Sequence, residues 1–477
     1  MPEYKWQIFF VTGIANITVT IAISGVALAL PIIAGEFGVS ISTISWLSLV
    51  YSMIPSCTLL IFGRIADLFG YRRQFINGFI IFGLSSLLLP SLAKGLAGLI
   101  FFRCIQGIGY AMMMSITQAL CNKVFPSNER GKALGVNSAF VSIGLAIGPS
   151  ISGLLMSNFS WRSIFYFNAL ISLFGVIISM IILEKDRIIP DTSHDMDWLG
   201  AVLFAVSIGL FALSLNFSAE WGILSIKFLA CITISLCLLL IFIYRENHTN
   251  VPLMKVKLFR NSVFTLANGA CFCSYTLQQM TTFLIPFFLM NVFLMSKSDS
   301  GLIMLVNPAT MMLLSPFGGR WADHRGSQKP ALTGLCILAA GCAFMSAMTG
   351  ETTVFIIIIA LVLYGAGCGL SVSAINSTIF SVVQREDSGM ASGMVGTMRN
   401  LGQAIGVVSS SLIISVRQQY YSTRAVEGSI GFPDGKEIYL MAQRDAYYFG
   451  FIIIAIAILC MIIIAIKRTG GMRDLGG

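Results

Sequence analysis

Stretches of mostly apolar residues, each about 20 residues long, recur along this chain from Ile8 to Ile466. A helix of that length crosses roughly 30 Å of hydrocarbon, where its backbone groups must bond to one another. Apolar residues make up 56% of the 477 residues and charged residues 11%, whereas a soluble domain carries roughly a quarter charged residues. The sequence therefore predicts an all-α integral membrane protein.

Apolar length and polar breaks predict fourteen spans in the order six, two, six. The first apolar stretch exceeds the roughly 7–15 residues of a signal-peptide core, so we expect it in the mature protein. We predict an N-terminal six-helix bundle over 1–184, two inserted helices with a cytoplasmic linker over 185–260, and a C-terminal six-helix bundle over 261–477. The predicted spans are 8–34, 43–62, 74–93, 97–121, 134–156, 163–183, 198–216, 223–244, 263–293, 300–318, 330–348, 353–380, 389–416 and 446–466.

Basic residues are distributed unevenly between the predicted loops. If the N-terminus is inside, the inner loops and the tails hold most of them, which satisfies the positive-inside rule. These loops explain the net charge of +9 without nucleic-acid binding. We expect a multi-pass protein of the cell membrane with both termini in the cytoplasm. The inner basic residues are Arg72, Arg73, Lys123, Arg130, Lys132, Arg245, Lys255, Lys257, Arg260, Arg325, Lys329, Lys467 and Arg468.

A short motif occurs twice in the chain. The segment from Gly63 to Gly70, GRIADLFG, returns from Gly319 to Gly326 as GRWADHRG, each time after the second predicted helix of its half. An even number of predicted spans separates the two copies. Both copies are therefore predicted to lie on one face of the membrane.

The motifs resemble those of the major facilitator superfamily and, within it, the fourteen-span drug/proton antiporters of the multidrug efflux type. The segment Gly63–Arg73 is similar to the family's loop motif, and Arg103-x-x-Gln106 and Gly144–Gly153 are similar to motifs of the fourth and fifth spans. The run Ser388–Gly406 looks like the family's penultimate span. The resemblance covers nearly the whole chain. It implies two six-helix bundles plus two inserted central helices.

This resemblance implies that the repeated loop motif is an inner gate. Its Asp67 would engage the start of the thirteenth span, near Ser388, because a helix N-terminus carries partial positive charge. That contact would hold the cytoplasmic side shut. The implied gating residues are Gly63, Asp67, Gly70, Arg72, Arg73, Gly319, Asp323 and Gly326.

The glycines of the fifth predicted span have a four-residue spacing, which lets two membrane helices approach closely. The proline that follows them removes a backbone hydrogen bond and bends the helix. By resemblance this is the exporter signature, and ordinary small-residue packing is the alternative reading. The motif consists of Gly144, Gly148, Pro149 and Gly153, with Ser152 in place of one glycine.

Arg103 lies well inside an apolar span, where a charge costs about 2.5 kcal/mol or more. We predict a coupling or substrate role for Arg103, Gln106 and Arg399; a pairing of Arg103 with backbone carbonyls or Gln106 that only fixes helices is the alternative. The sequence has no Asp or Glu deep in a predicted span, and Ala22 aligns with the acid of relatives. This leaves open a neutral or zwitterionic substrate, or an anion held by Arg103.

By the same resemblance, the first and fourth helices of each half surround a central substrate cavity. Each polar or aromatic residue there could instead join neighbouring helices. The residues that we predict to line the cavity are Asn16, Thr20, Ser24, Tyr110, Tyr275, Gln278, Gln279, Tyr364 and Asn376, together with Gln106.

The leading hypothesis is a secondary transporter that exports drug-like or amphipathic small molecules in exchange for protons, by alternating access. The sequence lacks P-loop, H-E-x-x-H and G-x-S-x-G motifs, so we expect no enzyme, no metal and no cofactor other than the coupling proton. We expect a monomer whose partners are the lipid bilayer and a small-molecule substrate. A uniporter or importer of a small organic solute is the alternative, and a non-transporting membrane sensor is a third reading.

Overall fold

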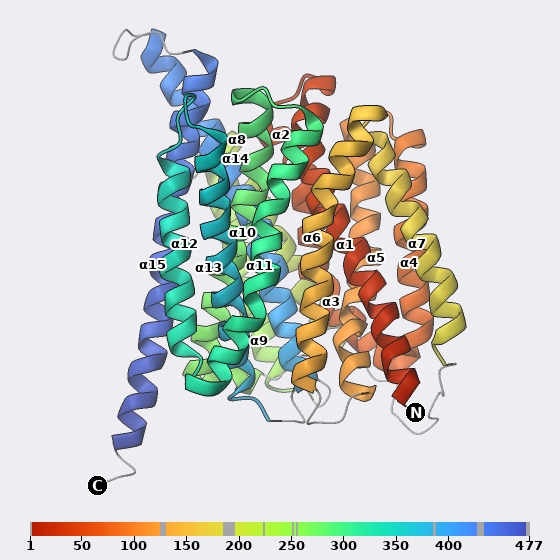
Figure 1. The fold of residues 1–477 in the computed structure, drawn as a ribbon. Coiled ribbons are helices and arrows are strands. Elements are labelled where there is room, and N and C mark those ends of the chain that lie inside the picture. The colour runs from red at the N-terminus through yellow and green to blue at the C-terminus, as the bar shows by residue number, and fades with distance from the viewer. Residues whose placement is uncertain are drawn as a thin grey trace.

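The computed structural model describes residues 2–124, 130–184, 196–222, 225–249, 252–253, 256–384, 388–426 and 434–473. In this part the regular secondary structure is helical, and the long helices stand side by side (Figure 1). Each predicted span corresponds to a helix, and the second predicted span is divided at Ser45.

The helices of the first half and the inserted pair are α1 (Pro2–Phe37), α2 (Ile41–Ile44), α3 (Trp46–Phe69), α4 (Tyr71–Leu92), α5 (Leu96–Val124), α6 (Arg130–Asn158), α7 (Arg162–Ile182), α8 (Trp198–Trp221) and α9 (Ile226–Glu246). The second half consists of the short 3-10 helix η1 (Val256–Arg260), α10 (Ser262–Phe287), the π-helical turn η2 (Phe288–Val292), α11 (Lys297–Arg325), α12 (Gln328–Ser346), α13 (Val354–Phe380), α14 (Ser388–Val426) and α15 (Gly435–Arg473).

Twelve helices in the described residues are long and apolar enough to cross a membrane by length and composition. The long helices α10 and α14 fall outside this set, although they run in the bundle beside the others (Figure 1). Both bury polar side chains, among them Asn268 and Gln279 on α10 and Asn400 and Gln403 on α14. Polar residues at membrane depth are tolerated where they face protein, so these two helices are suited to the interior of the bundle.

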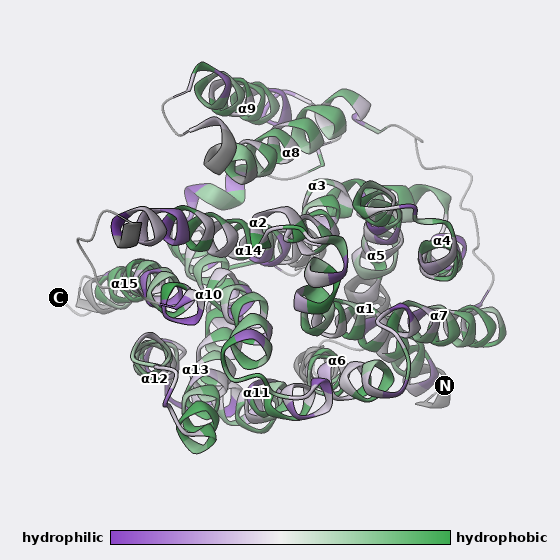
Figure 2. Cartoon of the chain, turned by 90° about the horizontal axis from the view of Figure 1, so that it is seen from above, coloured by the Kyte–Doolittle hydropathy of each residue, from purple (hydrophilic) through white to green (hydrophobic). Residues whose placement is uncertain are grey.

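The helices form two groups when they are seen from above (Figure 2). One group contains α1 and α3–α7, the other contains α10–α15, and the inserted pair α8 and α9 lies outside both. α8 packs against α3 of the first group and α14 of the second. The rings of Trp46 and Phe217 join α3 and α8, with centroids 5.1 Å apart. The inserted pair therefore covers the line along which α3 meets α14.

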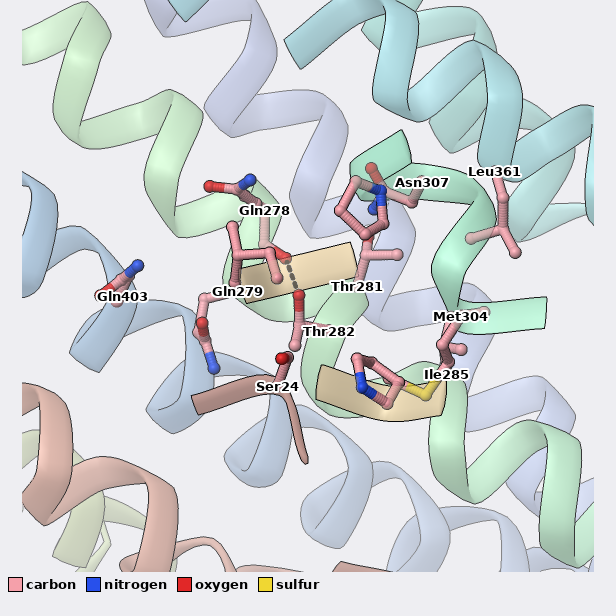
Figure 3. Close-up of a pocket in the computed structure, with 13 residues that line it drawn as sticks. Ser24, Gln278, Gln279, Thr281, Thr282, Ile285, Met304, Asn307, Leu361 and Gln403 are labelled. Carbon is pink, nitrogen blue, oxygen red and sulfur yellow. Dashed lines mark hydrogen bonds between the residues drawn. The ribbon is translucent and has the colours of Figure 1, made fainter. Parts of the chain in front are cut away.

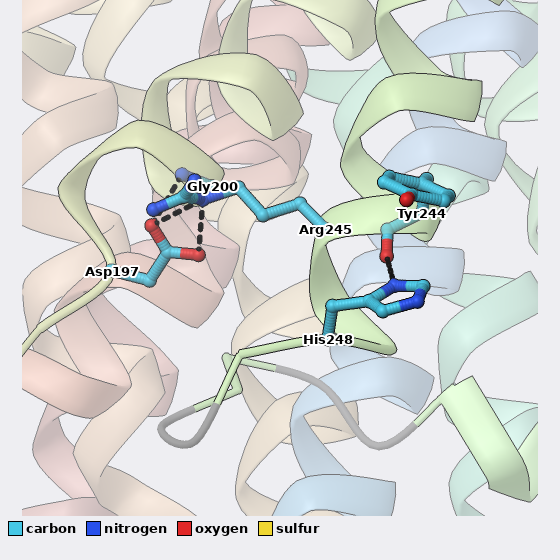
Figure 4. A network of polar contacts seen from close by, with 5 residues as sticks. All are labelled: Asp197, Gly200, Tyr244, Arg245 and His248. Atoms are coloured by element: carbon cyan, nitrogen blue, oxygen red, sulfur yellow. Dashed lines mark hydrogen bonds and ion pairs between the residues drawn. The ribbon is translucent and has the colours of Figure 1, made fainter.

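An ion pair joins the two inserted helices at one end (Figure 4). The Nε of Arg245 on α9 lies 2.8 Å from both carboxylate oxygens of Asp197, which directly precedes α8. The backbone N–H of Gly200 also donates to Asp197, at 2.9 Å, and so caps the start of α8. Further along the pair, the hydroxyl of Ser235 donates to the Ser207 carbonyl at 2.8 Å. These contacts fix α9, whose outward face is apolar, to α8.

The repeated motif ends a helix in the same way in both halves. Gly70 terminates α3 with φ 104° and ψ 140°, and Gly326 terminates α11 with φ 81° and ψ 149°. Only glycine adopts this backbone region readily. The chain then turns directly into α4 or α12, so the repeat is explained locally as a helix-turn-helix junction. The side chains of Asp67 and Asp323 lie outside the described residues.

The sequence prediction was wrong about the segment between the last two spans. It placed the ends of these spans at 416 and 446, whereas α14 continues to Val426 and α15 begins at Gly435. The two extensions rise past the neighbouring helices (Figure 1). Asp445 joins them by an ion pair with Arg417 at 2.9 Å and by accepting a hydrogen bond from Tyr421 at 2.7 Å. Hydropathy detects only the apolar part of a helix, so it misses polar turns that continue outside the lipid.

The start of α1 and the end of α15 lie at the same end of the bundle (Figure 1). The side of the membrane that this end faces stays a prediction.

We expect Gly70→Ala to lower the stability of the protein, because an alanine at φ 104° is strained by about 1–3 kcal/mol. Gly63→Ala is the matched control, since a Cβ there would have nothing within 4 Å and alanine is favoured over glycine in a helix. The apparent melting temperature of the detergent-solubilised protein should fall for Gly70→Ala and stay the same or rise for Gly63→Ala. Equal melting temperatures would contradict the assigned backbone conformation.

Candidate functional site

A central cavity lies between the two groups of helices (Figure 3). Its empty space is about 550 Å³ when the gaps between the lining atoms and the part that opens to the outside are both counted. Helices α1 and α6 of the first group and α10, α11, α13 and α14 of the second supply its walls. The lining residues are Ser24, Leu145, Pro149, Gln278, Gln279, Thr281, Thr282, Ile285, Met304, Asn307, Pro308, Leu361 and Gln403.

The polar part of the lining consists of carboxamides and hydroxyls. α10 contributes most of it, because residues three and four apart share one face of a helix, as Gln278, Thr281 and Thr282 do. The Thr282 hydroxyl donates to the Gln278 carbonyl at 2.9 Å (Figure 3). In the described part of the chain, every lining residue is uncharged. The cavity can therefore offer hydrogen-bond donors and acceptors, but no direct counter-charge.

Three of the residues predicted for the cavity line it, namely Ser24, Gln278 and Gln279, and Pro149 of the glycine motif does so as well. The others lie elsewhere. The Asn16 amide donates to the Thr12 carbonyl at 2.9 Å, and the Thr20 hydroxyl donates to the Asn16 carbonyl at 2.6 Å. The Tyr364 hydroxyl donates to the backbone of α10, and Tyr275, Asn376, Gln106 and Tyr110 are also absent from the lining.

Sequence reasoning missed Thr281, Thr282, Asn307 and Gln403, which also line the cavity. The two threonines follow Gln278 on the same helix face, so helical periodicity could have found them. Asn307 and Gln403 lie on the second and fifth helices of their half, which were not considered. Each could have been found in the sequence as a carboxamide residue inside a predicted apolar span.

Arg103 lies inside the first group of helices and does not line the cavity. It is 1% exposed, its Nε donates to the Leu47 carbonyl at 3.0 Å, and its Nη1 donates to Gln106 at 3.0 Å. Its guanidinium lies 4.0 Å from the ring centroid of Tyr51. Gln106 in turn donates to the Ser86 hydroxyl at 2.7 Å. These contacts join α3, α4 and α5. This is the arrangement expected if Arg103 only fixes helices through backbone carbonyls and Gln106, which was the alternative reading.

A chain of aromatic contacts leads from Arg103 to the second group of helices. The rings of Tyr51 and Tyr110 are stacked with centroids 5.4 Å apart. The Tyr110 hydroxyl donates to the Asn400 side chain on α14 at 2.6 Å, in a fully buried place. Arg399 lies beside the same hydroxyl and near Tyr275. Tyr110 and Arg399 are therefore placed at the contact between the two groups.

The glycine motif gives α6 a close contact with α1. A Cβ added to Gly144 would collide with the Thr20 hydroxyl and lie 3.0 Å from Ile17 Cα. A Cβ added to Gly148 would collide with the Ser24 hydroxyl. The two glycines thus let α6 approach α1 to a distance that any larger side chain would prevent.

The far end of the same motif contacts α11 of the second group. A Cβ added to Gly153 would lie 2.6 Å from the Lys297 carbonyl, and one added to Gly301 would collide with the Pro149 carbonyl. The Ser150 hydroxyl and the Lys297 ammonium donate to backbone carbonyls across the contact, at 3.4 and 3.3 Å. α6 therefore binds both groups of helices beside the cavity.

At the other end of the bundle, α3 contacts α14. Gly393 and Gly396 of α14 face the side chains of Leu60 and Leu59, which would lie 3.1 and 3.2 Å from added Cβ atoms. This junction lies next to the repeated motif at the end of α3. The Arg72 guanidinium donates to the Met180 carbonyl of α7 at 2.9 Å. The side chain of Asp67 and those at the start of α14, near Ser388, lie outside the described residues. The predicted gate contact between them therefore stays a prediction.

The sequence model of the Major Facilitator Superfamily matches residues 12–407 and, in a second match, residues 267–470. The chain belongs to the Major Facilitator Superfamily. It is thus a membrane transporter and not an enzyme.

Similar proteins of the Major Facilitator Superfamily include two curated transporters. The riboflavin transporter RibZ of Clostridioides difficile is 28% identical over 446 residues, which cover 94% of each chain. The multidrug resistance protein Stp of Mycobacterium tuberculosis is 29% identical over 386 residues, which cover 80% of this chain and 70% of that protein. The chain thus resembles transporters whose names give different substrates.

A solved structure shows the same fold. It is a bacterial homologue of the human lysosomal transporter Spinster, described as inward-facing and unoccupied. The two chains superpose with a TM-score of 0.69 at 13% identity, covering 96% of this chain and 97% of the other. The major facilitator fold predicted from the sequence is confirmed.

We expect Arg103→Lys to destabilise this transporter without changing substrate affinity. Lysine cannot reproduce the Nε bond to Leu47 together with the Nη1 bond to Gln106, and the loss of such buried bonds costs about 1–3 kcal/mol. The apparent melting temperature should fall, whereas the KM for a transported compound should stay the same. A raised KM with an unchanged melting temperature would instead indicate that Arg103 binds the substrate.

We expect Gly153→Ala to impair transport, because the added Cβ would lie 2.6 Å from the Lys297 carbonyl. Overpacking of this kind costs about 1–3 kcal/mol, which is roughly one to two powers of ten in the population of this conformation. Transport by the variant in vesicles should fall accordingly. Gly269→Ala is the control, since its Cβ would have the Cys460 sulfur 3.9 Å away. If both variants transport equally well, the α6–α11 contact does not limit the cycle.

Proposed function

We propose that this transporter exports drug-like or amphipathic small molecules in exchange for protons, by alternating access between its two groups of helices. The observation that carries the proposal is the contact of α6 with α11, which joins the two groups through Gly153 and Gly301 beside the central cavity. The glycine motif that makes this contact resembles the exporter signature of the family. The similarity to a protein named a multidrug resistance protein supports export as the direction and drug-like molecules as the substrates.

Alternating access requires a cavity whose walls belong to both moving parts. The cavity meets this requirement, because Ser24 and Pro149 come from the first group and Gln278, Asn307 and Gln403 from the second. The two groups contact each other at one end of the bundle through Gly153 of α6 and Lys297 of α11, and at the other end through Gly393 of α14 and Leu60 of α3. Opening one contact while the other stays closed would expose the cavity to one face of the membrane at a time.

The proton-coupling residue is proposed from the few carboxylates near the path. Glu36 at the end of α1 accepts hydrogen bonds from Trp161 at 2.6 Å and from Arg162 at 2.8 Å, so both of its oxygens are held at the rim. We therefore assign the inner gate, and the coupling to protons, to Asp67 at the end of α3. The protein is proposed to act as a monomer in the cell membrane, with both termini in the cytoplasm.

A second candidate is a uniporter or importer of a small organic solute. The similarity to a riboflavin transporter over 94% of both chains favours it. The uncharged cavity lining favours it as well, because a cationic drug would find no counter-charge among the described lining residues. This candidate shares the fold but needs no coupling ion.

Proteoliposomes with an acidic interior would separate the two candidates. An antiporter is expected to accumulate a compound inside against its concentration gradient, and collapse of the pH gradient should release it. Suitable fluorescent probes are riboflavin, which is uncharged, and ethidium, which is a cation. Liposomes without protein are the control. Uptake that only equilibrates, with or without the pH gradient, would refute proton-coupled export and support the uniporter.

A further inference from the structure

Four carboxamide side chains surround the central cavity and lie on three different helices. They are Gln278 and Gln279 on α10, Asn307 on α11 and Gln403 on α14. We infer that the substrate is an uncharged molecule with an apolar body and one hydrogen-bonding edge, such as the N–H and C=O edge of a cyclic imide. The inference rests on the proposed transport function and names the class of compound that this cavity accepts.

The lining combines polar and apolar side chains (Figure 3). Gln279 and Gln403 lie on one side of the cavity, whereas Ile285, Met304 and Leu361 lie on the other, with Asn307 beside Leu361 (Figure 3). A ligand that is polar all round, such as a sugar, would place hydroxyl groups against the apolar side and lose their hydration. A molecule with one polar edge and one apolar body fits both sides.

Gln403 carries the clearest sign of a missing ligand group. Its side chain is 8% exposed and lines the cavity, yet its Oε1 has no hydrogen-bond partner among the described residues. A buried acceptor of this kind is costly unless a donor fills it. A ligand N–H would do so.

Gln278 supplies the complementary group. Its Nε2 donates to the Met311 sulfur at 3.3 Å, and a thioether sulfur is a weak acceptor. A ligand carbonyl would be a better acceptor for the same N–H group. The cavity therefore offers an acceptor on Gln403 and a donor on Gln278, which together suit a molecule that carries both an N–H and a C=O group.

The charges around the cavity oppose the binding of a cation but not the binding of a neutral molecule. A charge that leaves water needs a partner of opposite sign, and the described lining residues provide none. Arg399 precedes Gln403 by four residues on α14, so it lies one helical turn away. Its positive charge opposes a cation, and its contact with the Tyr110 hydroxyl already engages it. An uncharged imide needs no counter-charge and is not repelled by Arg399.

Binding to the purified protein in lipid nanodiscs tests the inference with three matched fluorescent probes. They are 1,8-naphthalimide, its N-methyl derivative, which lacks the N–H donor, and an N-alkyl derivative that carries a trimethylammonium group. We expect 1,8-naphthalimide to bind about tenfold more tightly than either of the others, as one hydrogen bond allows. Gln403→Leu should remove the difference between the imide and its N-methyl derivative.

Gln443→Leu is the matched control for this substitution. Gln443 on α15 is 1% exposed, and its Oε1 likewise has no partner among the described residues, but it does not line the cavity. Its variant should bind all three probes as the wild type does. Gln403→Glu should raise the affinity for the trimethylammonium probe about tenfold, because it supplies the missing counter-charge.

The inference is overturned if 1,8-naphthalimide does not bind, if the cationic probe binds more tightly to the wild type, or if Gln403→Leu and Gln443→Leu behave alike. Gradient-driven uptake of the cation alone would refute the inference and leave the proposed export intact. Selective imide binding without any gradient-driven uptake would refute the proposed export and leave the inference intact.

Discussion

The close approach of α6 to a helix on each side is the constraint on which the rest of the structure depends. Gly144 and Gly148 bring it against α1 in its own group, and Gly153 brings it against α11 in the other. Lipid supplies no hydrophobic force between membrane helices, so close packing at small residues and hydrogen bonds between helices must hold them together. Because Pro149 lies between these two contacts, the same helix also forms a wall of the cavity.

Charged and uncharged polar groups occupy different places inside the protein. The buried guanidinium of Arg103 is satisfied within the first group by Leu47, Gln106 and Tyr51, whereas the cavity between the groups is lined by uncharged amides and hydroxyls. The polar helices α10 and α14 can carry those amides because they face protein rather than lipid. Recognition in the cavity then depends on hydrogen-bond geometry and shape.

The sequence predicted the helices and their order well, because a membrane span needs a long apolar run whatever its neighbours are. It predicted Ser24, Gln278 and Gln279 in the cavity through the family resemblance, but not Asn307 or Gln403. Whether a carboxamide faces a cavity or another helix depends on how helices are rotated against one another, and hydropathy does not record that rotation. The placement of Arg103 away from the cavity was undetermined for the same reason.

The central claim is that one cavity opens to either side of the membrane in turn. A variant without the eleven native cysteines and with cysteine in place of Thr282, which lines the cavity, can be labelled in vesicles by an impermeant maleimide applied from one side or the other. We predict labelling from both sides, with a ratio that changes when a substrate or a pH gradient is added. Labelling from one side only, under every condition, would contradict the account.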